Sequence, residues 1–154
     1  MDKKFSSVVN RHLEDDTGLL MLQISNLWKD HHSKVLKKYF GLTQIQYAVL
    51  IDLYWFKTRN KNPVTQTMLA KHIRIDMMTL SYIFKGLEAR GLVSRITHPV
   101  DVRAKAVDLT EEGKELMDQA MSIVEEVDRK FFEVLGKDAG RFNKYLRKLL
   151  SPKN

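Results

Sequence analysis

The residues from Asp76 to Arg90 predict a short helix with two chemically different faces. Apolar side chains recur at helical spacing on one face, which should anchor the helix to its neighbours. The opposite face presents small hydroxyls, a tyrosine, a lysine and a glycine, which leave room for a base-pair edge or a phosphate to approach. Leu80, Ile83, Phe84 and Leu87 form the anchoring face with Met77 near its edge, and Met78, Thr79, Ser81, Tyr82, Lys85 and Gly86 form the opposite face.

The opposite face of this helix has side chains suited to DNA recognition. Thr79 and Ser81 can donate to or accept from bases and phosphates, and Tyr82 can bond a phosphate or pack on a sugar. Met78 can touch the methyl group of a thymine. The alternative is a solvent-exposed face without a function, but such a face would usually carry more Glu and Lys. We therefore predict that this helix reads base pairs.

A second group of side chains lies on the loop of residues 98–103. Asp101 and Arg103 are two residues apart and share a side in an extended chain, so the carboxylate can orient the guanidinium. An oriented arginine at the tip of a hairpin suits a narrow minor groove, where the potential of DNA is most negative. The alternative is a surface hairpin with one ordinary ion pair. The residues that could add phosphate contacts are Arg95, His98 and Lys105.

The positive charge of the chain is concentrated around these two groups. The net charge is +7, and residues 57–105 hold ten Lys or Arg against three Asp or Glu. The residues before this segment hold seven against six, and the residues after it hold nine against ten. A concentrated positive field attracts a polyanion to the middle of the chain. A basic face that only meets solvent is the alternative that charge alone leaves open.

The elements that position these groups have the order of a winged helix-turn-helix. A short helix from Thr65 to His72, a tight turn and the helix capped by Asp76 match helix-turn-helix spacing. Gly91 suits the position just after the end of the second helix. Alternating residues then predict two strands over 92–97 and 104–109. The expected inward-facing residues of this ribbon are Ile96, Val107 and Leu109.

Long helices flank this core. A helix of about 24 residues ends at Gly41 and is apolar nearly all round in its first half. A capping box of Thr43 and Gln46 starts the next helix, which runs to about Lys57. From Thr110, one helix to Gly136 and a last helix close the chain with many apolar residues. We expect these flanks to join two copies, so that two recognition helices meet half-sites one turn apart. Packing within one chain is the alternative.

The stretch from Leu69 to Gly113 resembles the MarR family of bacterial transcription regulators. The long first helix, the order of the helices and the two closing helices also match, so the resemblance covers nearly the whole chain. It implies a homodimer, joined by its terminal helices, that binds a pseudo-palindromic operator in duplex DNA as a repressor or an activator. The most specific part is the wing pattern D-x-R-A followed by a strand and L-T-x-x-G, here Asp101, Arg103, Ala104, Leu109, Thr110 and Gly113.

The resemblance also implies roles for single residues. Thr65 and Gln66 would approach phosphate at the start of their helix, and Arg103 would enter the minor groove. Tyr82 departs from the family pattern, since many members carry Arg or a small polar residue there, so the base preference is not implied. The residues placed in the major groove are Asp76, Met77, Met78, Thr79, Ser81, Tyr82 and Lys85.

The family resemblance raises the question of a pocket for a small aromatic effector. Members of the family bind aromatic acids and drugs between the dimer helices and the DNA-binding lobe. Aromatic and imidazole side chains of the first two helices could line such a pocket, and ordinary core packing is the alternative for each of them. They are Trp28, His31, His32, Tyr47, Tyr54 and Trp55.

Our interpretation is a mainly α fold with a winged helix-turn-helix core, a short β-ribbon wing and long N- and C-terminal dimerisation helices. The chain forms one domain, 1–154. Within it, segments 1–40 and 111–154 carry dimerisation and segment 43–110 forms the DNA-binding lobe. No signal peptide and no run of ~20 apolar residues is visible, so we expect a cytoplasmic protein without membrane contact.

The sequence gives no support for catalysis, a cofactor or a metal. The chain has no cysteine, which excludes disulfides, thiolate ligands and thiol chemistry. No nucleophile elbow, phosphate-binding loop or paired-histidine metal motif occurs. His31 and His32 are adjacent, so on a helix they project about 100° apart and cannot easily share a metal.

Two other classes of function stay open. A winged helix can serve as a protein-docking surface, and salt-dependent binding to duplex DNA would separate that class from the preferred one. A small hydrolase or transferase is a more distant alternative, because the sequence suggests no pair of nucleophile and base.

Overall fold

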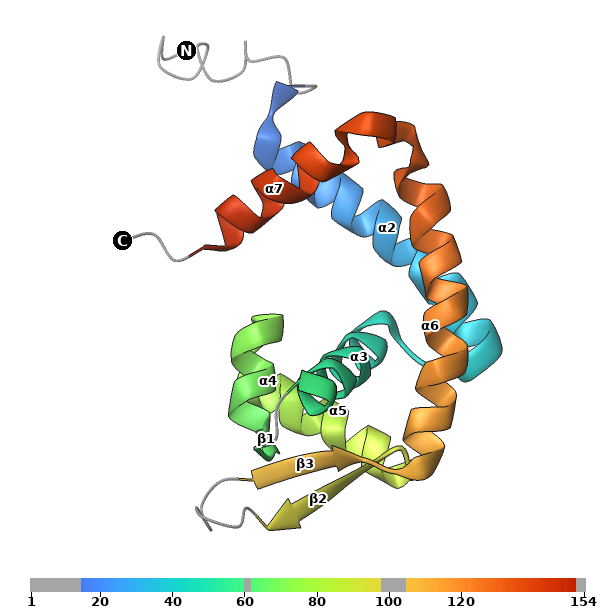
Figure 1. The fold of residues 1–154 in the computed structure, drawn as a ribbon, viewed down its shortest axis with the longest axis vertical. Helices are drawn as coiled ribbons and strands as arrows, with labels where there is room; N and C mark the ends of the chain where they lie inside the picture. The colour runs from blue at the N-terminus through green and yellow to red at the C-terminus, as the bar shows by residue number, and fades with distance from the viewer. Residues whose placement is uncertain (1–14, 60–61, 98–104, 152–154) are drawn as a thin grey trace, which may run out of the picture.

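The computed structural model describes residues 15–59, 62–97 and 105–151. Figure 1 shows a compact lobe of short helices and a small sheet, from which longer helices extend on one side. This arrangement confirms the predicted fold class. The elements are α2 (Thr17–Phe40), α3 (Gln44–Arg59), β1 (Val64–Thr65), α4 (Gln66–Ile73), α5 (Met77–Ala89), β2 (Val93–Thr97), β3 (Lys105–Leu109), α6 (Glu111–Phe132), the 3₁₀ segment η2 (Glu133–Asp138) and α7 (Ala139–Leu150).

Side-chain caps fix the starts of five helices, four of them at the predicted caps and one at Asp16, which was not predicted as a cap. At α3 the capping box is reciprocal: Gln46 N–H donates to Thr43 Oγ1 at 3.2 Å, and Thr43 N–H donates to Gln46 Oε1 at 2.9 Å. Each cap satisfies a backbone N–H that the first turn leaves unpaired. The capping residues of the other four helices, α2, α4, α5 and α6, are Asp16, Thr65, Asp76 and Thr110.

The sheet has three strands where a two-stranded ribbon was predicted. Its order is β1-β3-β2, and both pairs are antiparallel. Val64 of β1 faces Val107 of β3, and Arg95 of β2 faces Val107 from the other side. The prediction missed β1 because a strand of only two residues shows no alternation of apolar and polar side chains.

One inward-facing residue of the ribbon was predicted wrongly. Val107 and Leu109 are buried as expected, but Ile96 is 40% exposed. Ile96 is the second-last residue of β2, at the end of the strand away from the buried Val93. Val93, at the start of β2, is buried in its place.

The core of the lobe is closed within one chain. Helices α3, α4 and α5 each contribute fully buried leucines, and Phe84 of α5 is the largest fully buried side chain. The second half of α2 adds Leu36 and the first half of α6 adds Met117, so both flanking helices are anchored in this core. The fully buried leucines of the three lobe helices are Leu50, Leu53, Leu69, Leu80 and Leu87.

A glycine lets α6 leave the sheet in close contact with the end of α5. The Thr110 hydroxyl donates to the Gly91 carbonyl at 2.6 Å and accepts from Gly113 N–H at 3.0 Å. A Cβ added to Gly113 would lie 2.0 Å from the carbonyl oxygen of Leu92. The L-T-x-x-G pattern therefore has a physical basis: the threonine caps α6, and only the absence of a side chain at Gly113 allows this approach.

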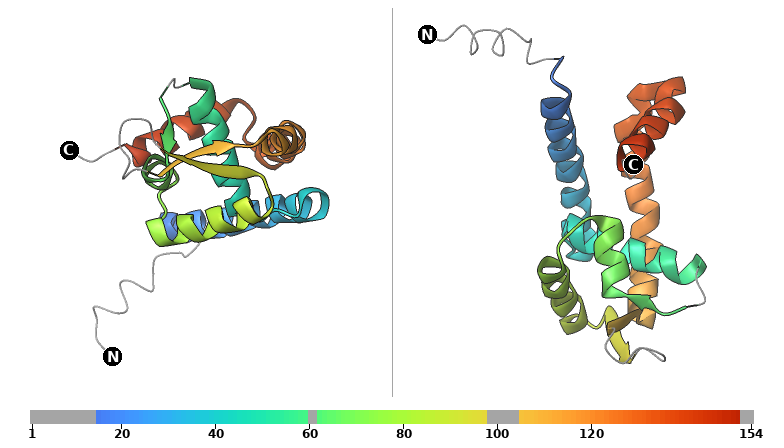
Figure 2. Two further views of the ribbon diagram at one scale, coloured as in Figure 1. Left: turned by 90° about the horizontal axis from the view of Figure 1, so that it is seen from below. Right: turned by 90° about the vertical axis from the view of Figure 1, so that its left-hand side faces the viewer.

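The far ends of the long helices are only partly covered. Figure 2 shows α2 on one side and α6 with α7 on the other, rising together from the lobe. Among the residues described for α2, only His32 and Leu36 are buried, and α7 has no buried residue. We call the first half of α2 together with α7 the arm. The α-helical part of α6 ends at Phe132, about one turn before the predicted end, and a 3₁₀ turn continues the chain to Gly136. Gly136, with φ of 46°, breaks the helical run at the predicted residue.

The arm holds an apolar cavity of about 610 Å³ between α2 and α7. It is lined from α2 by Leu20, Ile24 and Trp28 and from α7 by Phe142, Tyr145 and Leu149. Several of these side chains remain well exposed to solvent, including Leu149 at 64%. The arm thus presents an apolar surface that one chain does not bury.

Candidate nucleic-acid interface

Helix α5 has the two faces that the sequence predicted. Leu80, Phe84 and Leu87 are fully buried against the lobe, whereas Met78 is 83% exposed and Tyr82 is 80% exposed. Lys85 and Thr79 are exposed as well, and Ser81 is half-buried. The buried face holds the helix firmly, so the outward side chains are presented on a rigid support.

The first turn of α5 is organised by Asp76. Its carboxylate accepts from the backbone N–H of Thr79 at 2.8 Å and from the Thr79 hydroxyl at 2.6 Å. These hydrogen bonds, the one from the hydroxyl first, lower the pKa of Asp76 below its usual value, so the group is anionic. The hydroxyl proton of Thr79 is donated to Asp76, so the Thr79 oxygen can act toward another group only as an acceptor. Met77, next to the cap, is 44% exposed.

The start of α4 differs from the prediction at one residue. Thr65 is half-buried and its hydroxyl accepts from Met68 N–H at 3.2 Å, so it acts as the cap. Gln66 was expected to approach phosphate, but its side chain is 3% exposed and its Nε2 has no hydrogen-bond partner. The first position of the helix places this side chain toward the lobe, and only its backbone N–H remains suited to an anion.

The turn between α4 and α5 contains a strained residue that the sequence did not reveal. Arg74 has φ of 63°, which among the described residues is the only left-handed backbone conformation outside glycine. Its Nη2 donates to the carbonyl oxygen of Leu150 at the end of α7, at 2.6 Å. The helix-turn-helix is thus linked directly to the arm.

The wing is described only at its base. Asp101, His98 and Arg103 lie outside the described residues, so their predicted roles stay predictions. Lys105 opens β3, where it pairs with Thr97 of β2. Arg95 forms an ion pair with Glu88 of α5, with 3.0 Å between Nε and Oε2, so part of its charge is already neutralised.

Three of the predicted effector residues meet around a carboxylate that the sequence did not single out. Trp28 Nε1–H donates to Asp128 Oδ1 at 2.7 Å, and His32 Nε2 lies 2.7 Å from the same oxygen. The rings of Trp28 and His32 are 4.2 Å apart, and Tyr47 meets His32 edge-on at 6.4 Å. Asp128 lies almost a hundred residues from its partners, and no local pattern could have indicated it.

Burial and charge set the ionisation of this cluster. Burial opposes ionisation of Asp128, but the hydrogen bonds from His32 and Trp28 outweigh it, and the pKa lies below its usual value. Burial first, and the nearby Asp128 charge second, raise the pKa of Tyr47 to about 12. The Nδ1 atom of the buried His32 has no partner. His31 points elsewhere and meets Phe131 edge-on at 5.3 Å.

The remaining two predicted effector residues do not join that cluster. Trp55 stacks on His72 of α4 with ring centroids 5.5 Å apart. The guanidinium of Arg59 also lies over the Trp55 ring, 4.8 Å from its centroid. His72 Nδ1 lies 2.6 Å from Asp52 Oδ1, and burial raises the pKa of Asp52 despite this partner. Tyr54 is half-buried at the edge of the core. The predicted set is therefore not brought together: three of its residues gather near Asp128, and His31, Tyr54 and Trp55 lie elsewhere.

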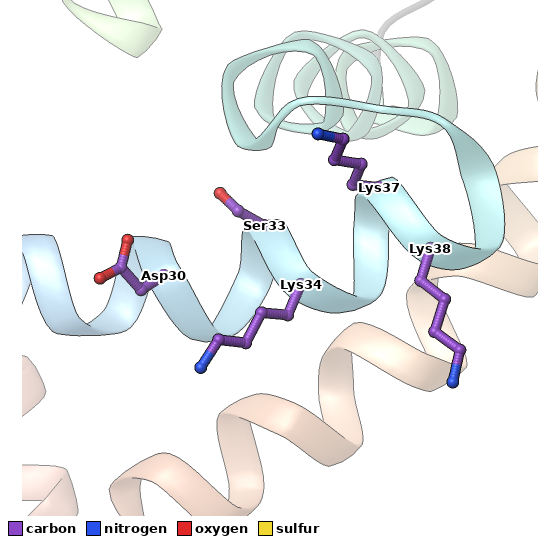
Figure 3. A pocket seen from close by; sticks show the side chains of 5 residues that line it. All are labelled: Asp30, Ser33, Lys34, Lys37 and Lys38. Atoms are coloured by element: carbon purple, nitrogen blue, oxygen red, sulfur yellow. The ribbon is translucent and has the colours of Figure 1, made fainter.

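A shallow pocket of about 390 Å³ on α2 is lined by Asp30, Ser33, Lys34, Lys37 and Lys38. Figure 3 shows that these side chains fan out from one helix, with Lys37 on one side and Lys34 and Lys38 on another. They do not converge on a common point, so this is a solvated basic face. Within the described ranges, no three His, Cys, Asp or Glu side chains are grouped to hold a metal ion. No helix there is both long and apolar enough to cross a membrane.

Comparison with known proteins agrees with this geometry. A model of the ArnR1-like winged-helix domain matches residues 32–128. The uncharacterized HTH-type transcriptional regulator YdcH of Bacillus subtilis (strain 168) is 32% identical over 115 residues, which cover 75% of this chain and 77% of YdcH.

Solved structures share nearly the whole fold. CouR from Rhodococcus jostii RHA1, bound to p-coumaroyl-CoA, superposes with a TM-score of 0.81 at 27% identity, over 94% of this chain and 99% of CouR. The S. aureus MepR–DNA complex superposes with a TM-score of 0.77 at 25% identity, over 89% of this chain and 96% of MepR. The family resemblance read from the sequence is thereby confirmed, and the homologues are regulators, not enzymes. The chain belongs to the MarR family of winged helix-turn-helix, DNA-binding transcriptional regulators.

Proposed function

We propose that this regulator acts as a homodimer that binds a pseudo-palindromic duplex operator with sequence specificity. Helix α5 enters the major groove of each half-site, and Arg103 on the wing enters the adjacent minor groove. The observation that carries the proposal is the division of α5 into a fully buried face and a face with Met78 and Tyr82 at 83% and 80% exposure. Relatedness to MepR, whose structure was solved with DNA, supports the same use of the fold.

The arm supports the homodimer. Leu20, Leu22 and Leu27 of α2 are 42%, 58% and 50% exposed, and Leu149 and Leu150 of α7 are 64% and 56% exposed. Exposed leucines in this number on two neighbouring helices indicate a surface that another protein covers. A second copy offers the same surface and brings a second α5, which a pseudo-palindromic site requires.

Selection of bound duplexes from a random pool tests DNA binding and the half-site spacing together. We expect an enriched inverted repeat with half-site centres one helical turn apart, and affinity that falls steeply with salt. Arg103→Ala should weaken binding to the enriched site by about 1–3 kcal/mol. An enriched site with a single, unrepeated half-site would contradict the homodimer, and no duplex binding at low salt would favour a protein-docking role.

We propose further that a small aromatic acid, or its thioester, binds in the arm and alters operator affinity. The support is the apolar cavity of about 610 Å³, a size typical of ligand sites, with Trp28 in its wall and tied to Asp128. Relatedness to CouR, solved with p-coumaroyl-CoA, points to the same chemical class.

A fluorescence titration with aromatic acids and their CoA thioesters tests this site. We expect quenching of Trp28 that survives Trp55→Phe and is lost in Trp28→Phe, together with a rise in melting temperature on saturation. Quenching carried entirely by Trp55 would place the ligand elsewhere, at the stack with His72.

A further inference from the structure

We propose that Met78 and Tyr82 form an apolar ridge on α5 that selects operator half-sites by the methyl groups of thymine. This inference rests on the proposed function and specifies how the major groove is read. The two residues are one helical turn apart, so they stand side by side on the exposed face. They are 83% and 80% exposed, while Leu80 and Phe84 on the opposite face are fully buried.

The choice of thymine follows from what the helix lacks. Purines are usually read by bidentate hydrogen bonds from Arg, Lys, Asn or Gln. Residues 77–89 read MMTLSYIFKGLEA and contain no Arg, Asn or Gln. Lys85 is the one side chain of that kind in this helix. It lies three residues after Tyr82, at the end of the ridge away from Met78.

The polar groups near the ridge are also restricted. The Thr79 hydroxyl proton is held by Asp76 at 2.6 Å, so Thr79 offers only an acceptor to a base. Ser81 is half-buried on the side of the helix. An anionic Asp76 beside Met78 disfavours a phosphate at the same place, because the two charges repel.

Thymine is the one base that matches an apolar ridge. Its C5-methyl group is the apolar feature of the major groove, whereas the other base edges present donors and acceptors. A methyl group moved from water to a methionine or tyrosine surface should change affinity about fourfold. The buried face of α5 holds the ridge in place, so contact with two methyl groups needs no rearrangement of the helix.

Replacement of thymine by deoxyuridine tests the inference, because it removes the methyl group and keeps the base pair. Each thymine of the half-site obtained by selection is replaced in turn, and the affinity of the full-length protein is measured. We expect one or two positions in each half-site where the loss is about fourfold. At positions where cytosine in place of thymine weakens binding, 5-methylcytosine should restore part of the affinity.

Variants of the ridge complete the experiment. Met78→Ala should bind more weakly and should no longer distinguish thymine from deoxyuridine at one position, and Met78→Leu should recover the distinction. Tyr82→Phe should keep the sensitivity at a second position, and Tyr82→Ala should lose it. Lys85→Ala is the matched control on the same helix: it should weaken binding to all duplexes and leave every thymine effect unchanged.

The outcomes separate the inference from the proposed function. Specific binding that is unchanged when every thymine of the half-site is deoxyuridine would overturn the apolar ridge and leave operator binding intact. Deoxyuridine effects that persist in Met78→Ala and Tyr82→Ala would also overturn it, because the methyl groups would then be read elsewhere. Absence of duplex binding by the wild-type protein would overturn both.

Discussion

Leucines of the lobe and leucines of the arm have opposite environments in the same chain. Leu50 and Leu80 in the lobe are fully buried, whereas Leu22 and Leu149 in the arm are 58% and 64% exposed. The lobe therefore completes its hydrophobic core by itself, and the arm does not. The difference indicates that the DNA-reading unit is stabilised within one chain, while the arm takes its final environment from something else, which we propose is a second copy.

The largest effect should come from the closed core of the lobe. Phe84→Ala removes a fully buried ring on the anchoring face of α5 and should lower the free energy of unfolding by about 3–5 kcal/mol. Urea denaturation followed by circular dichroism measures it. The comparison predicts a much smaller loss for Leu22→Ala in the arm when both variants are measured as monomers at low concentration. Equal losses would contradict a closed lobe.

The next effect belongs to the junction between the sheet of the lobe and the start of α6. Gly113→Ala places a methyl group where the Leu92 carbonyl oxygen lies 2.0 Å away, so the backbone of α6 must shift. We expect a loss of about 3 kcal/mol in the free energy of unfolding, at the upper end of overpacking effects. Gly140→Ala is the control, since a Cβ at Gly140 meets nothing within 4 Å. A stable Gly113→Ala variant would show that the junction can relax.

A change in the arm should affect association and leave folding of the lobe intact. Leu149→Ala should weaken the dimer by about 2 kcal/mol for each buried leucine, as seen by sedimentation at several concentrations. Denaturation of the dilute protein should stay close to wild type. A variant that dimerises normally but unfolds earlier would mean that Leu149 supports its own chain.

The smallest effect should appear where arm and lobe meet, at Asp128. The hydrogen bonds from His32 and Trp28 hold the pKa of Asp128 in the folded state below its usual range, so the native state binds fewer protons than the unfolded state in acid. The stability from Asp128 is present above the usual pKa of an aspartate and is lost as the pH falls through the lowered pKa of the folded state.

Asp128→Asn should therefore be less stable near neutral pH by about 1 kcal/mol and should lose less on acidification. Denaturation at a series of pH values from about 6 to 3 measures the difference between the variant and wild type. Glu126, whose pKa is lowered to about 2 by Arg129 and Lys130, contributes to both proteins equally. Parallel curves over the whole range would contradict the assignment to Asp128.

Features set by nearby residues were predictable from the sequence. The caps at Thr65, Asp76 and Thr110 depend on side chains and N–H groups three residues apart, and Gly41 and Gly91 adopt the expected left-handed conformation. The two faces of α5 followed from helical spacing alone, because Leu80 and Met78 fall on different sides of any helix.

Features set by distant residues were not predictable in this way. The bonds of Trp28 and His32 to Asp128, and of Arg74 to Leu150, depend on how the long helices are placed in space. Gln66 was expected to approach phosphate because of the family resemblance, yet the position of α4 against the lobe buries its side chain. Local patterns do not contain that information, since each contact joins segments that only the complete fold brings together.

The hydrogen bond from Arg74 to the Leu150 carbonyl has a thermodynamic meaning for regulation. It joins the turn between α4 and α5 to the last residue of α7. A displacement of α7 therefore changes the free energy of that turn, and a displacement of the turn changes the free energy of α7. Coupling of this kind is reciprocal. If the contact of α7 with Arg74 raises the affinity for DNA fivefold, bound DNA must favour that contact by the same factor, about 1 kcal/mol. For the proposed operator complex, this reciprocity makes the contact between Arg74 and Leu150 a point at which DNA binding and the position of α7 are linked.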